Sequence, residues 1–544
     1  MHDNPTIFQS FEWDLPNDQK HYKRLLGILP SLHYIGITSL WLPPACKAGN
    51  STGNGYDVYD LYDLGEFEQR GSRSTKWGSK EDLMALAGKA EELKVDLYFD
   101  AVLNHRCGGD AKQTVWAVEI DPDDHLEELC SPKEVEVWLQ FHFPGRGGKY
   151  SWTQYDWHMF NASDWDDRSQ KHAIWRITNE GKNWAKDVSK EWGNGDYLMF
   201  NNMDYTNGAL REDVNNWGVW VAKELRLGGF RLDAIQHFSQ AFSSDWIHHV
   251  RHHVDRDVFV VGEYWNNSVR ILTEYLKNSP PDLHLYDAPL LHNLSHLSWS
   301  PMPDLRVVFE YTLVQLRPQN AVTLVMNHDT QKGQVMDTPI HHDFVSLAYS
   351  LILFRQDGYP CVFYGDMYGT SEPHPSPPKC YGKLADLVLA RKLYAYGEQV
   401  DHFEDAHCIG WVRKGLPTSH HESSRNAGMA VVMRWSGQGH ESPYRVPSLL
   451  RKPYWMRRIT SLKVKFGIGQ SRNVHQIRMN VGAQHAGEVW TDLLGWSSEK
   501  VCITPDGYGV FTCNENSVAV FVSERADGRS QFPINFDTNI YHHG

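Results

Sequence analysis

Eight short apolar segments, separated by amphipathic helical segments, occupy most of the first 395 residues of this 544-residue chain. They are residues 6–11, 37–42, 95–100, 229–233, 258–263, 283–288, 322–327 and 359–364. Short apolar strands that alternate with helices are typical of βα units and a parallel sheet. Eight such units close into a barrel whose functional residues lie at the carboxyl ends of the strands. The sequence therefore predicts an α/β fold built on a (β/α)8 TIM barrel.

Two stretches interrupt this alternation. Residues 105–205 are rich in aromatic residues, Gly and Asp, and they are too long for an ordinary βα loop. After about residue 400 the chain changes to short β-rich runs, which favour an antiparallel β domain. We therefore expect a barrel from 1–104 and 206–398, a small inserted domain at 105–205 after the third strand, and a C-terminal β-sandwich at 399–544.

Four of the predicted strands end in polar blocks. The blocks are residues 100–105, 229–233, 261–264 and 327–329. Together they present three carboxylates, Asp233, Glu263 and Asp329, at strand ends where a buried charge is costly unless it has a partner or a chemical role. Paired carboxylates cleave glycosidic bonds through an oxocarbenium-like transition state. The blocks therefore predict a glycosidase centre, and the alternative is a set of ion-paired strand ends.

At these blocks the chain resembles the α-amylase family of glycoside hydrolases, family 13. It is most similar to the bacterial liquefying type and its fungal intracellular relatives. Further segments that resemble the family are residues 55–67, 141–147, 358–369 and 482–492, so the resemblance covers nearly the whole chain. It implies endo-acting hydrolysis of α-1,4-glucosidic bonds in starch-type or glycogen-type glucans by a retaining mechanism.

The resemblance also implies catalytic roles. Asp233 would be the nucleophile, Glu263 the general acid and then base, and Asp329 a stabiliser of the transition state. Arg231 lies two residues before Asp233, so in a strand both side chains face the same way, and we expect the guanidinium to keep Asp233 ionised. Apolar and aromatic neighbours should favour a proton on Glu263 near neutral pH.

The expected substrate-binding side chains surround these acids. They are Tyr56, His105, Arg231, Gln236, His237, Trp265 and His328. We expect Tyr56 to stack on the sugar ring and the histidines at 105 and 328 to donate hydrogen bonds to sugar hydroxyls. Gln236 stands where the family often has Lys, a change that would alter the contacts of the leaving or accepting sugar.

The resemblance further implies a calcium ion where the inserted domain meets the barrel. The matching positions are Asn104, Asp196, Asn202 and the backbone carbonyl of His237, and oxygen atoms of this kind are suitable ligands for calcium. Asn202 replaces an aspartate of the bacterial relatives, and Asn161 and Ala185 replace acids of their extended metal cluster. We therefore expect one calcium ion at most, and the alternative is a polar junction without metal.

The amino-acid composition limits the kinds of molecule that the protein is expected to bind. The formal net charge of −14 argues against nucleic acid or an anionic membrane and is compatible with a neutral glucan. No stretch is long enough to span a membrane and the first residues lack a secretory signal, so we expect a cytoplasmic monomer. The eight cysteines are scattered without metal-binding or CxxC spacing, and we expect reduced thiols.

Two other functions stay open. A 4-α-glucanotransferase would form the same covalent intermediate and pass the sugar to another sugar hydroxyl instead of to water. A non-catalytic glucan-binding protein would need no buried acid beside a nucleophile, so the three carboxylates argue against it. The basic segment 440–480, with nine Lys or Arg residues, is expected to be a solvated insertion and not a binding arm.

Overall fold

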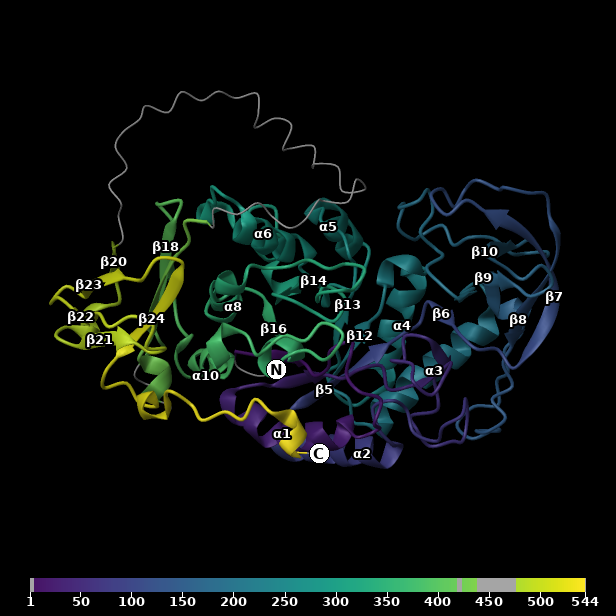
Figure 1. Cartoon of the computed structure of the whole chain (residues 1–544), viewed down its shortest axis with the longest axis horizontal. Helices are drawn as coiled ribbons and strands as arrows, with labels where there is room; N and C mark the ends of the chain where they lie inside the picture. The colour runs from purple at the N-terminus through teal and green to yellow at the C-terminus, as the bar shows by residue number, and fades with distance from the viewer. Residues whose placement is uncertain (1–3, 418–422, 438–475, 544) are drawn as a thin grey trace, which may run out of the picture.

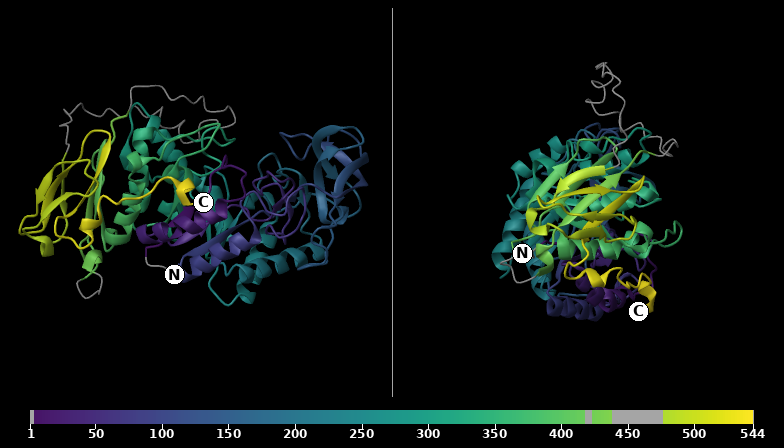
Figure 2. Two further views of the ribbon diagram at one scale, coloured as in Figure 1. Left: turned by 60° about the horizontal axis from the view of Figure 1, so that its bottom comes forward. Right: turned by 90° about the vertical axis from the view of Figure 1, so that its left-hand side faces the viewer.

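The computed structural model describes residues 4–417, 423–437 and 476–543, and it shows a central barrel with a β-sheet region at each end (Figure 1). One β region, which contains β7 to β10, lies at the right-hand end of this view, and the other, which contains β18 to β24, lies at the left-hand end. The views in Figure 2 place the same two regions on opposite sides of the barrel. Most of the basic segment 440–480 lies outside the described residues.

The barrel contains eight parallel strands in closed order. In chain order they are β1 (Ile7–Gln9), β2 (Ser39–Trp41), β5 (Asp96–Ala101), β12 (Gly229–Leu232), β13 (Phe259–Gly262), β14 (Leu283–Tyr286), β15 (Ala321–Leu324) and β16 (Tyr359–Phe363). The ring closes because β1 pairs with both β16 and β2. Each strand overlaps the segment predicted for it, which confirms the (β/α)8 barrel.

Helices surround the barrel strands. They are α1 (His21–Ile35), α2 (Lys80–Leu93), α3 (Gly208–Glu224), α4 (Gln240–His253), α5 (Val269–Lys277), α6 (Ala288–Trp299), α7 (Leu313–Leu316), α8 (Val345–Leu353), α9 (Tyr364–Tyr368) and α10 (Leu384–Tyr394). At the start of α2, Ser79 accepts a hydrogen bond from the Asp82 backbone N–H and the Asp82 side chain accepts one from the Ser79 N–H. This capping box fixes the first turn, and the apolar face of α2 then packs against the barrel.

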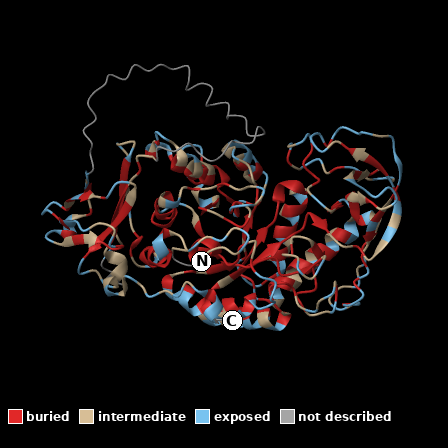
Figure 3. Ribbon diagram, viewed as in Figure 1, coloured by how far each residue is buried: buried red, intermediate tan, exposed pale blue. Residues whose placement is uncertain are grey.

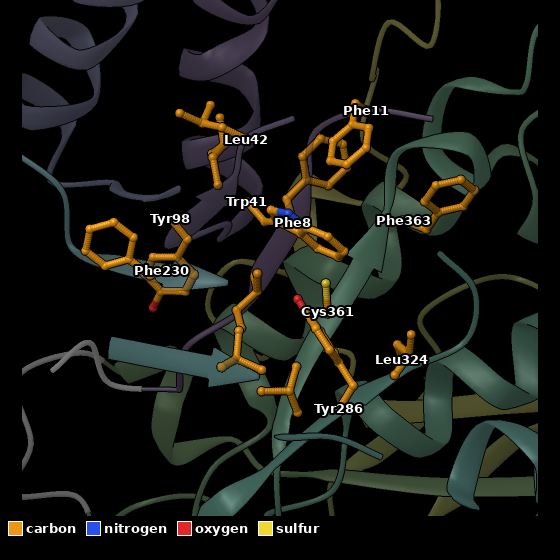
Figure 4. Close-up of a cluster of buried hydrophobic side chains, with 14 of the residues drawn as sticks. Phe8, Phe11, Trp41, Leu42, Tyr98, Phe230, Tyr286, Leu324, Cys361 and Phe363 are labelled. Carbon is orange, nitrogen blue, oxygen red and sulfur yellow. The ribbon is translucent and has the colours of Figure 1, made fainter. Parts of the chain in front are cut away.

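Aromatic side chains fill the interior of the barrel (Figure 4). Trp41, Tyr286 and Phe363 lie in this cluster on three different strands, and none is more than 1% exposed. The rings of Trp41 and Tyr286 lie 5.4 Å apart between centroids. In Figure 3 the barrel strands are mostly buried, whereas the helices expose one face. The interior is therefore a packed core that supports polar side chains at the strand ends above it.

The inserted sheet leaves the barrel directly after β5 and returns at α3. Its strands are β6 (His105–Arg106), β7 (Ala111–Ile120), β8 (Lys133–Gln140), β9 (Phe160–Asp166), β10 (Lys171–Ile177) and β11 (Asn201–Met203), in the spatial order β6-β11-β9-β10-β7-β8. A separate pair, β3 (Lys47–Ala48) and β4 (Val58–Asp60), lies between β2 and β5 in the chain. The insertion after the third barrel strand is as predicted.

The C-terminal region has two antiparallel sheets. The larger has the order β17-β18-β19-β24-β21-β22, from β17 (Gln399–His402), β18 (Cys408–Arg413), β19 (Met429–Arg434), β24 (Ser517–Ser523), β21 (Val489–Asp492) and β22 (Lys500–Cys502). The smaller pairs β20 (Gln476–Asn480) with β23 (Tyr508–Thr512). Side chains of both sheets, among them Val432, Phe521, Met479 and Phe511, share one buried cluster. The predicted antiparallel domain is confirmed, and its limits at 399–544, like those at 105–205, remain our proposal.

Within the residues that the structure describes, no helix combines the length and the apolar character needed to cross a membrane.

Candidate active site

Arg231 on β12 joins three carboxylates from three adjacent strands. The parallel register places Arg231 beside Asp100 on β5 and beside Val261 on β13. Its Nη1 donates to Asp100 Oδ1 at 2.7 Å and to Asp233 Oδ1 at 2.6 Å. Its Nη2 lies 2.6 Å from Glu263 Oε1, in an ion pair that is poorly aligned for a hydrogen bond. One buried guanidinium therefore holds Asp233 and Glu263 close together.

The pKa of Asp233 is raised, whereas the sequence led us to expect that Arg231 would keep this carboxyl ionised. Arg231 does favour its charged form, but burial outweighs the guanidinium and raises the pKa of Asp233 to about 6. Asp233 is only 7% exposed, so loss of water around the charge is the larger effect. The net shift is upward, not downward, although a carboxyl with this pKa is still mostly ionised at neutral pH.

Burial also raises the pKa of the two other acids. For Glu263 the loss of solvent is the largest cause, and Arg231 opposes it. For Asp329 burial acts first and the negative charge of Glu263 adds to it, so its pKa lies well above the usual range. Carboxyls that share a site and have raised pKa values can exchange a proton with a bound substrate near neutral pH. The centre therefore offers both an ionised carboxylate and a proton donor.

Asp100 is a member of this centre to which the sequence assigned no role. It is fully buried, and in addition to Arg231 it accepts hydrogen bonds from Tyr56 OH at 2.8 Å and Trp41 Nε1 at 2.9 Å. Asp100 therefore fixes both the guanidinium and the Tyr56 ring. The sequence did contain a signal for this role, because Asp100 is the first residue of a polar block at the end of a predicted strand.

A set of near-parallel rings lies beside the carboxylates. The rings of Tyr56 and His328 are 5.1 Å apart at an angle of 7°, and Trp13 stacks on both at 5.8 and 5.9 Å. Trp13 and Tyr56 are partly exposed. A flat aromatic surface of this kind suits the apolar face of a sugar ring. The sequence predicted Tyr56 and His328 here but missed Trp13, which no motif marked.

The proton on His328 can be assigned from its neighbours. Gln9 Nε2 lies 3.0 Å from His328 Nδ1 and can only donate, so Nδ1 is the acceptor. Burial holds the pKa of His328 well below its usual range, so the ring is neutral and carries its proton on Nε2. That Nε2 lies 3.2 Å from Asp329 Oδ2. Gln9, another residue that the sequence missed, thereby leaves the proton on the nitrogen nearer Asp329, in a contact that is poorly aligned for a hydrogen bond.

His105 has protein partners on both ring nitrogens. Its Nε2 donates to the Tyr56 carbonyl oxygen at 2.7 Å, and its Nδ1 lies 3.1 Å from Asn104 Oδ1. The side chain is 1% exposed, and burial lowers its pKa to about 4. His105 therefore holds the backbone of Tyr56, while its expected hydrogen bond to a sugar hydroxyl stays a prediction.

The remaining predicted binding residues lie around the end of β12 and β13. His237 Nδ1 donates to the Gly195 carbonyl at 2.6 Å, and its ring stacks on Trp192. Gln236 is buried and its side-chain oxygen has no hydrogen-bond partner within the described residues. Trp265 is partly buried against the main core. The structure thus gives His237 a role at the junction with the inserted segment.

The four predicted metal-site residues meet at one point. Asn104 Nδ2 lies 2.6 Å from the His237 carbonyl oxygen, 3.1 Å from Asn202 Oδ1 and 3.4 Å from the Asp196 carbonyl oxygen. Asn104 and Asn202 are fully buried and Asp196 is 1% exposed. Three oxygen atoms from the barrel and the inserted segment therefore surround one amide group.

The contact between Asn104 and His105 bears on whether a cation fits. A neutral His105 that donates from Nε2 presents an acceptor at Nδ1, and this acceptor faces the Asn104 oxygen. A rotation of the amide by 180° would satisfy His105 and turn the Asn104 oxygen toward the other three oxygens. Four oxygens around one point would supply part of the six to eight oxygen ligands that calcium takes, and water can supply the rest. The residues present therefore fit a calcium ion.

Neighbouring amides link the inserted segment to this point. Asn202 Nδ2 donates to Asn161 Oδ1 at 2.8 Å, and Asn161 Nδ2 donates to Asp196 Oδ2 at 2.7 Å. The Ala185 backbone N–H also donates to Asp196 Oδ2, at 2.8 Å. Neutral groups thus satisfy the Asp196 carboxylate. In 4–417, 423–437 and 476–543, no group of three or more His, Cys, Asp or Glu side chains could hold a metal.

Comparison with known proteins identifies relatives over almost the whole chain. The family model for the α-amylase catalytic domain matches residues 17–435. The α-amylase of Bacillus licheniformis is 38% identical over 95% of this chain and 93% of its own, and the cytoplasmic α-amylase of Escherichia coli is 33% identical over 96% and 99%. The crystal structure of an α-amylase from Geobacillus thermoleovorans complexed with acarbose covers 96% of this chain and 98% of its own, with a TM-score of 0.56 at 16% identity. That structural likeness supports the fold.

Proposed function

This chain belongs to the α-amylase family of glycoside hydrolases, and we propose that it hydrolyses internal α-1,4 bonds of starch-type or glycogen-type glucans. The observation that carries this proposal is the single buried guanidinium that holds Asp233 and Glu263 together at the ends of β12 and β13. The relatives that cover nearly the whole chain are named α-amylases, which supports the substrate class.

In the proposed reaction Asp233 Oδ attacks the anomeric carbon of the sugar while Glu263 gives its proton to the departing glycosidic oxygen. The bond from the anomeric carbon to that oxygen breaks, and an ester between the sugar and Asp233 forms. Glu263, now ionised, takes a proton from water, and the resulting oxygen attacks the anomeric carbon and releases Asp233. Two inversions retain the configuration.

The rest of the site would position the sugar. The partly exposed rings of Trp13 and Tyr56 would contact its apolar face. Asp329 would accept hydrogen bonds from sugar hydroxyls, with His328 Nε2 at 3.2 Å from its Oδ2. Arg231 would stabilise the Asp233 carboxylate before attack and after release.

A 4-α-glucanotransferase remains the second candidate, because one observation favours it. The buried oxygen of Gln236 has no hydrogen-bond partner in the described part of the chain, and a shift of this side chain toward the site would let it accept a bond from the hydroxyl of an incoming sugar. A better held sugar acceptor would compete with water for the same covalent intermediate.

Incubation of the purified protein with maltoheptaose separates these functions. For a hydrolase we expect only shorter oligosaccharides, with reducing ends that rise in step with each cleavage. Products longer than maltoheptaose, with little net rise in reducing ends, would identify a transferase. The complete absence of new products would contradict both enzymatic proposals for this substrate.

We also propose that one calcium ion binds Asn104, Asn202 and the carbonyl oxygens of Asp196 and His237. The ion would fasten the inserted segment to the barrel and so shape the site from a distance. With free calcium at about a hundred times its Kd, binding would stabilise the fold by about 2.7 kcal/mol.

We expect calcium to raise the melting temperature by several degrees over protein kept in EGTA, as measured by calorimetry. Asn202→Asp adds a charged ligand and should lower the calcium Kd at least several-fold, because affinity rises with ligand charge. Exposed Asn278→Asp is the matched control and should leave the Kd unchanged. Equal melting temperatures with and without calcium, in both the natural protein and Asn202→Asp, would contradict the proposed site.

We further propose a cytoplasmic location and a monomer. The relative from E. coli is named a cytoplasmic α-amylase, which supports the first of these.

A further inference from the structure

Two cysteines of the C-terminal region lie in the same buried cluster. Cys408 is the first residue of β18 in the larger sheet, and Cys513 directly follows β23 of the smaller sheet. Both thiols are free, both belong to the buried cluster between the sheets, and each cysteine is the largest influence on the pKa of the other. The pair therefore spans the two sheets.

The surroundings of this pair favour thiolate chemistry. Arg434 on β19 is the direct register partner of Cys408, and cross-strand partners share one face of a sheet. Cys513 is the largest cause of the lowered pKa of Cys408, whereas Cys408 and burial raise the pKa of Cys513 well above its usual range; the Arg434 guanidinium favours the charged form of both. A thiolate beside a cation is the nucleophilic form of cysteine.

The pair is also close to solvent, although each side chain is buried. Cys408 and Cys513 are 2% and 7% exposed, but their chain neighbours His407 and Asn514 are both exposed. Each cysteine lies at the end of a strand, where local opening costs least. A small oxidant can therefore reach the sulfurs without unfolding of the sandwich.

We infer that Cys408 and Cys513 form a redox pair that closes to a disulfide when the protein meets a low-molecular-weight disulfide such as oxidised glutathione. The Cys408 thiolate attacks one sulfur of glutathione disulfide and releases one glutathione thiolate. Cys513 loses its proton and attacks the mixed disulfide at Cys408, which releases the second. Two thiols are oxidised and one disulfide is reduced to two thiols.

The crosslink would tie the start of β18 in the larger sheet to the end of β23 in the smaller one. It closes a loop from residue 408 to residue 513, which includes the stretch 438–475 outside the described residues. A disulfide around so long a loop restricts the unfolded chain strongly and so stabilises the folded one. The sequence predicted reduced thiols throughout. The proposed pair would instead be reduced or oxidised according to the ratio of oxidised to reduced glutathione around the protein.

The test uses the full-length protein in buffers of increasing oxidised-to-reduced glutathione ratio, with free thiols then alkylated and counted by mass spectrometry. We expect two thiols to disappear together, a peptide pair linked through Cys408 and Cys513, and a melting temperature several degrees higher that dithiothreitol reverses. Cys408→Ser and Cys513→Ser should each abolish the linked peptide and the shift. Cys502→Ser, which removes an exposed cysteine of the same region, should retain both.

Two outcomes would overturn the inference. One is that both thiols stay open to alkylation after prolonged oxidation of the folded protein, including at a few degrees below its melting temperature. The other is that glutathione adds to single cysteines without a Cys408–Cys513 link. Neither readout depends on enzymatic activity, so failure here is distinguishable from failure of the proposed function.

Discussion

Replacement of Asp233 by Asn should lower kcat on maltoheptaose by about 10⁴-fold or more, as expected when a residue that forms the covalent intermediate is removed. The amide has the same shape, and its oxygen can still accept the Arg231 Nη1 bond that now measures 2.6 Å. It cannot form a stable ester with the anomeric carbon. Binding of maltoheptaose, measured by calorimetry, should stay within a few-fold because the aromatic rings and Asp329 are unchanged.

A matched control separates loss of the nucleophile from loss of any buried carboxylate. Asp366 is 2% exposed and accepts a hydrogen bond from Tyr349 OH at 2.6 Å, which an Asn can also accept. Asp366→Asn should therefore keep kcat within about tenfold. Activity of Asp233→Asn within tenfold of the natural protein would show that Asp233 is not the nucleophile and would favour a different acid or a binding role.

The sequence was sufficient for the barrel because each strand is a compact local signal. Strand-forming runs end in acids at positions 100, 233 and 263, and the order of parallel units in a closed barrel follows from the topology rules. The same signals placed Arg231 beside Asp233, since residues two apart in a strand share a face. These inferences need only short stretches of chain.

The sequence did not predict which individual side chains contact one another. Gln9 and His328 are separated by 319 positions and meet only because β1 closes the ring against β16. His105 has the Tyr56 carbonyl as a partner, 2.7 Å from its Nε2, across 49 positions of the chain. Such contacts depend on rotamers and on which strands become neighbours, so no local pattern marks them.

The stability of the centre depends on Arg231 more than on any one acid. Its side chain is fully buried and contacts Asp100, Asp233 and Glu263 at 2.7, 2.6 and 2.6 Å. Arg231→Leu would leave these carboxylates in the core without a cation, and an uncompensated buried charge costs about 3–5 kcal/mol. We therefore expect a large fall in the free energy of unfolding at neutral pH, measured by urea denaturation, together with loss of detectable turnover.

The pH dependence of this loss tests its cause. Without the guanidinium the folded-state pKa values of the three acids rise further above their unfolded values, which are near 4. An acid whose folded pKa is raised destabilises the fold as pH increases from the unfolded pKa to the folded one. The stability deficit of Arg231→Leu should consequently be small near pH 4 and should grow toward pH 8. A deficit of equal size at both pH values would indicate lost packing instead of unpaired charge.

Two further substitutions separate the charge of Arg231 from its geometry. Arg231→Lys restores one positive charge but not the fork that reaches Asp233 and Glu263 at once, so it should recover much of the stability and little of the activity. Arg226→Leu removes an arginine whose side chain is 66% exposed, and its effect on stability should stay within about 0.5 kcal/mol at every pH. Recovery of activity by Arg231→Lys would mean that charge alone suffices. If Arg231→Lys does not recover activity, turnover depends on the two-pronged guanidinium of Arg231, which aligns the nucleophile with the acid.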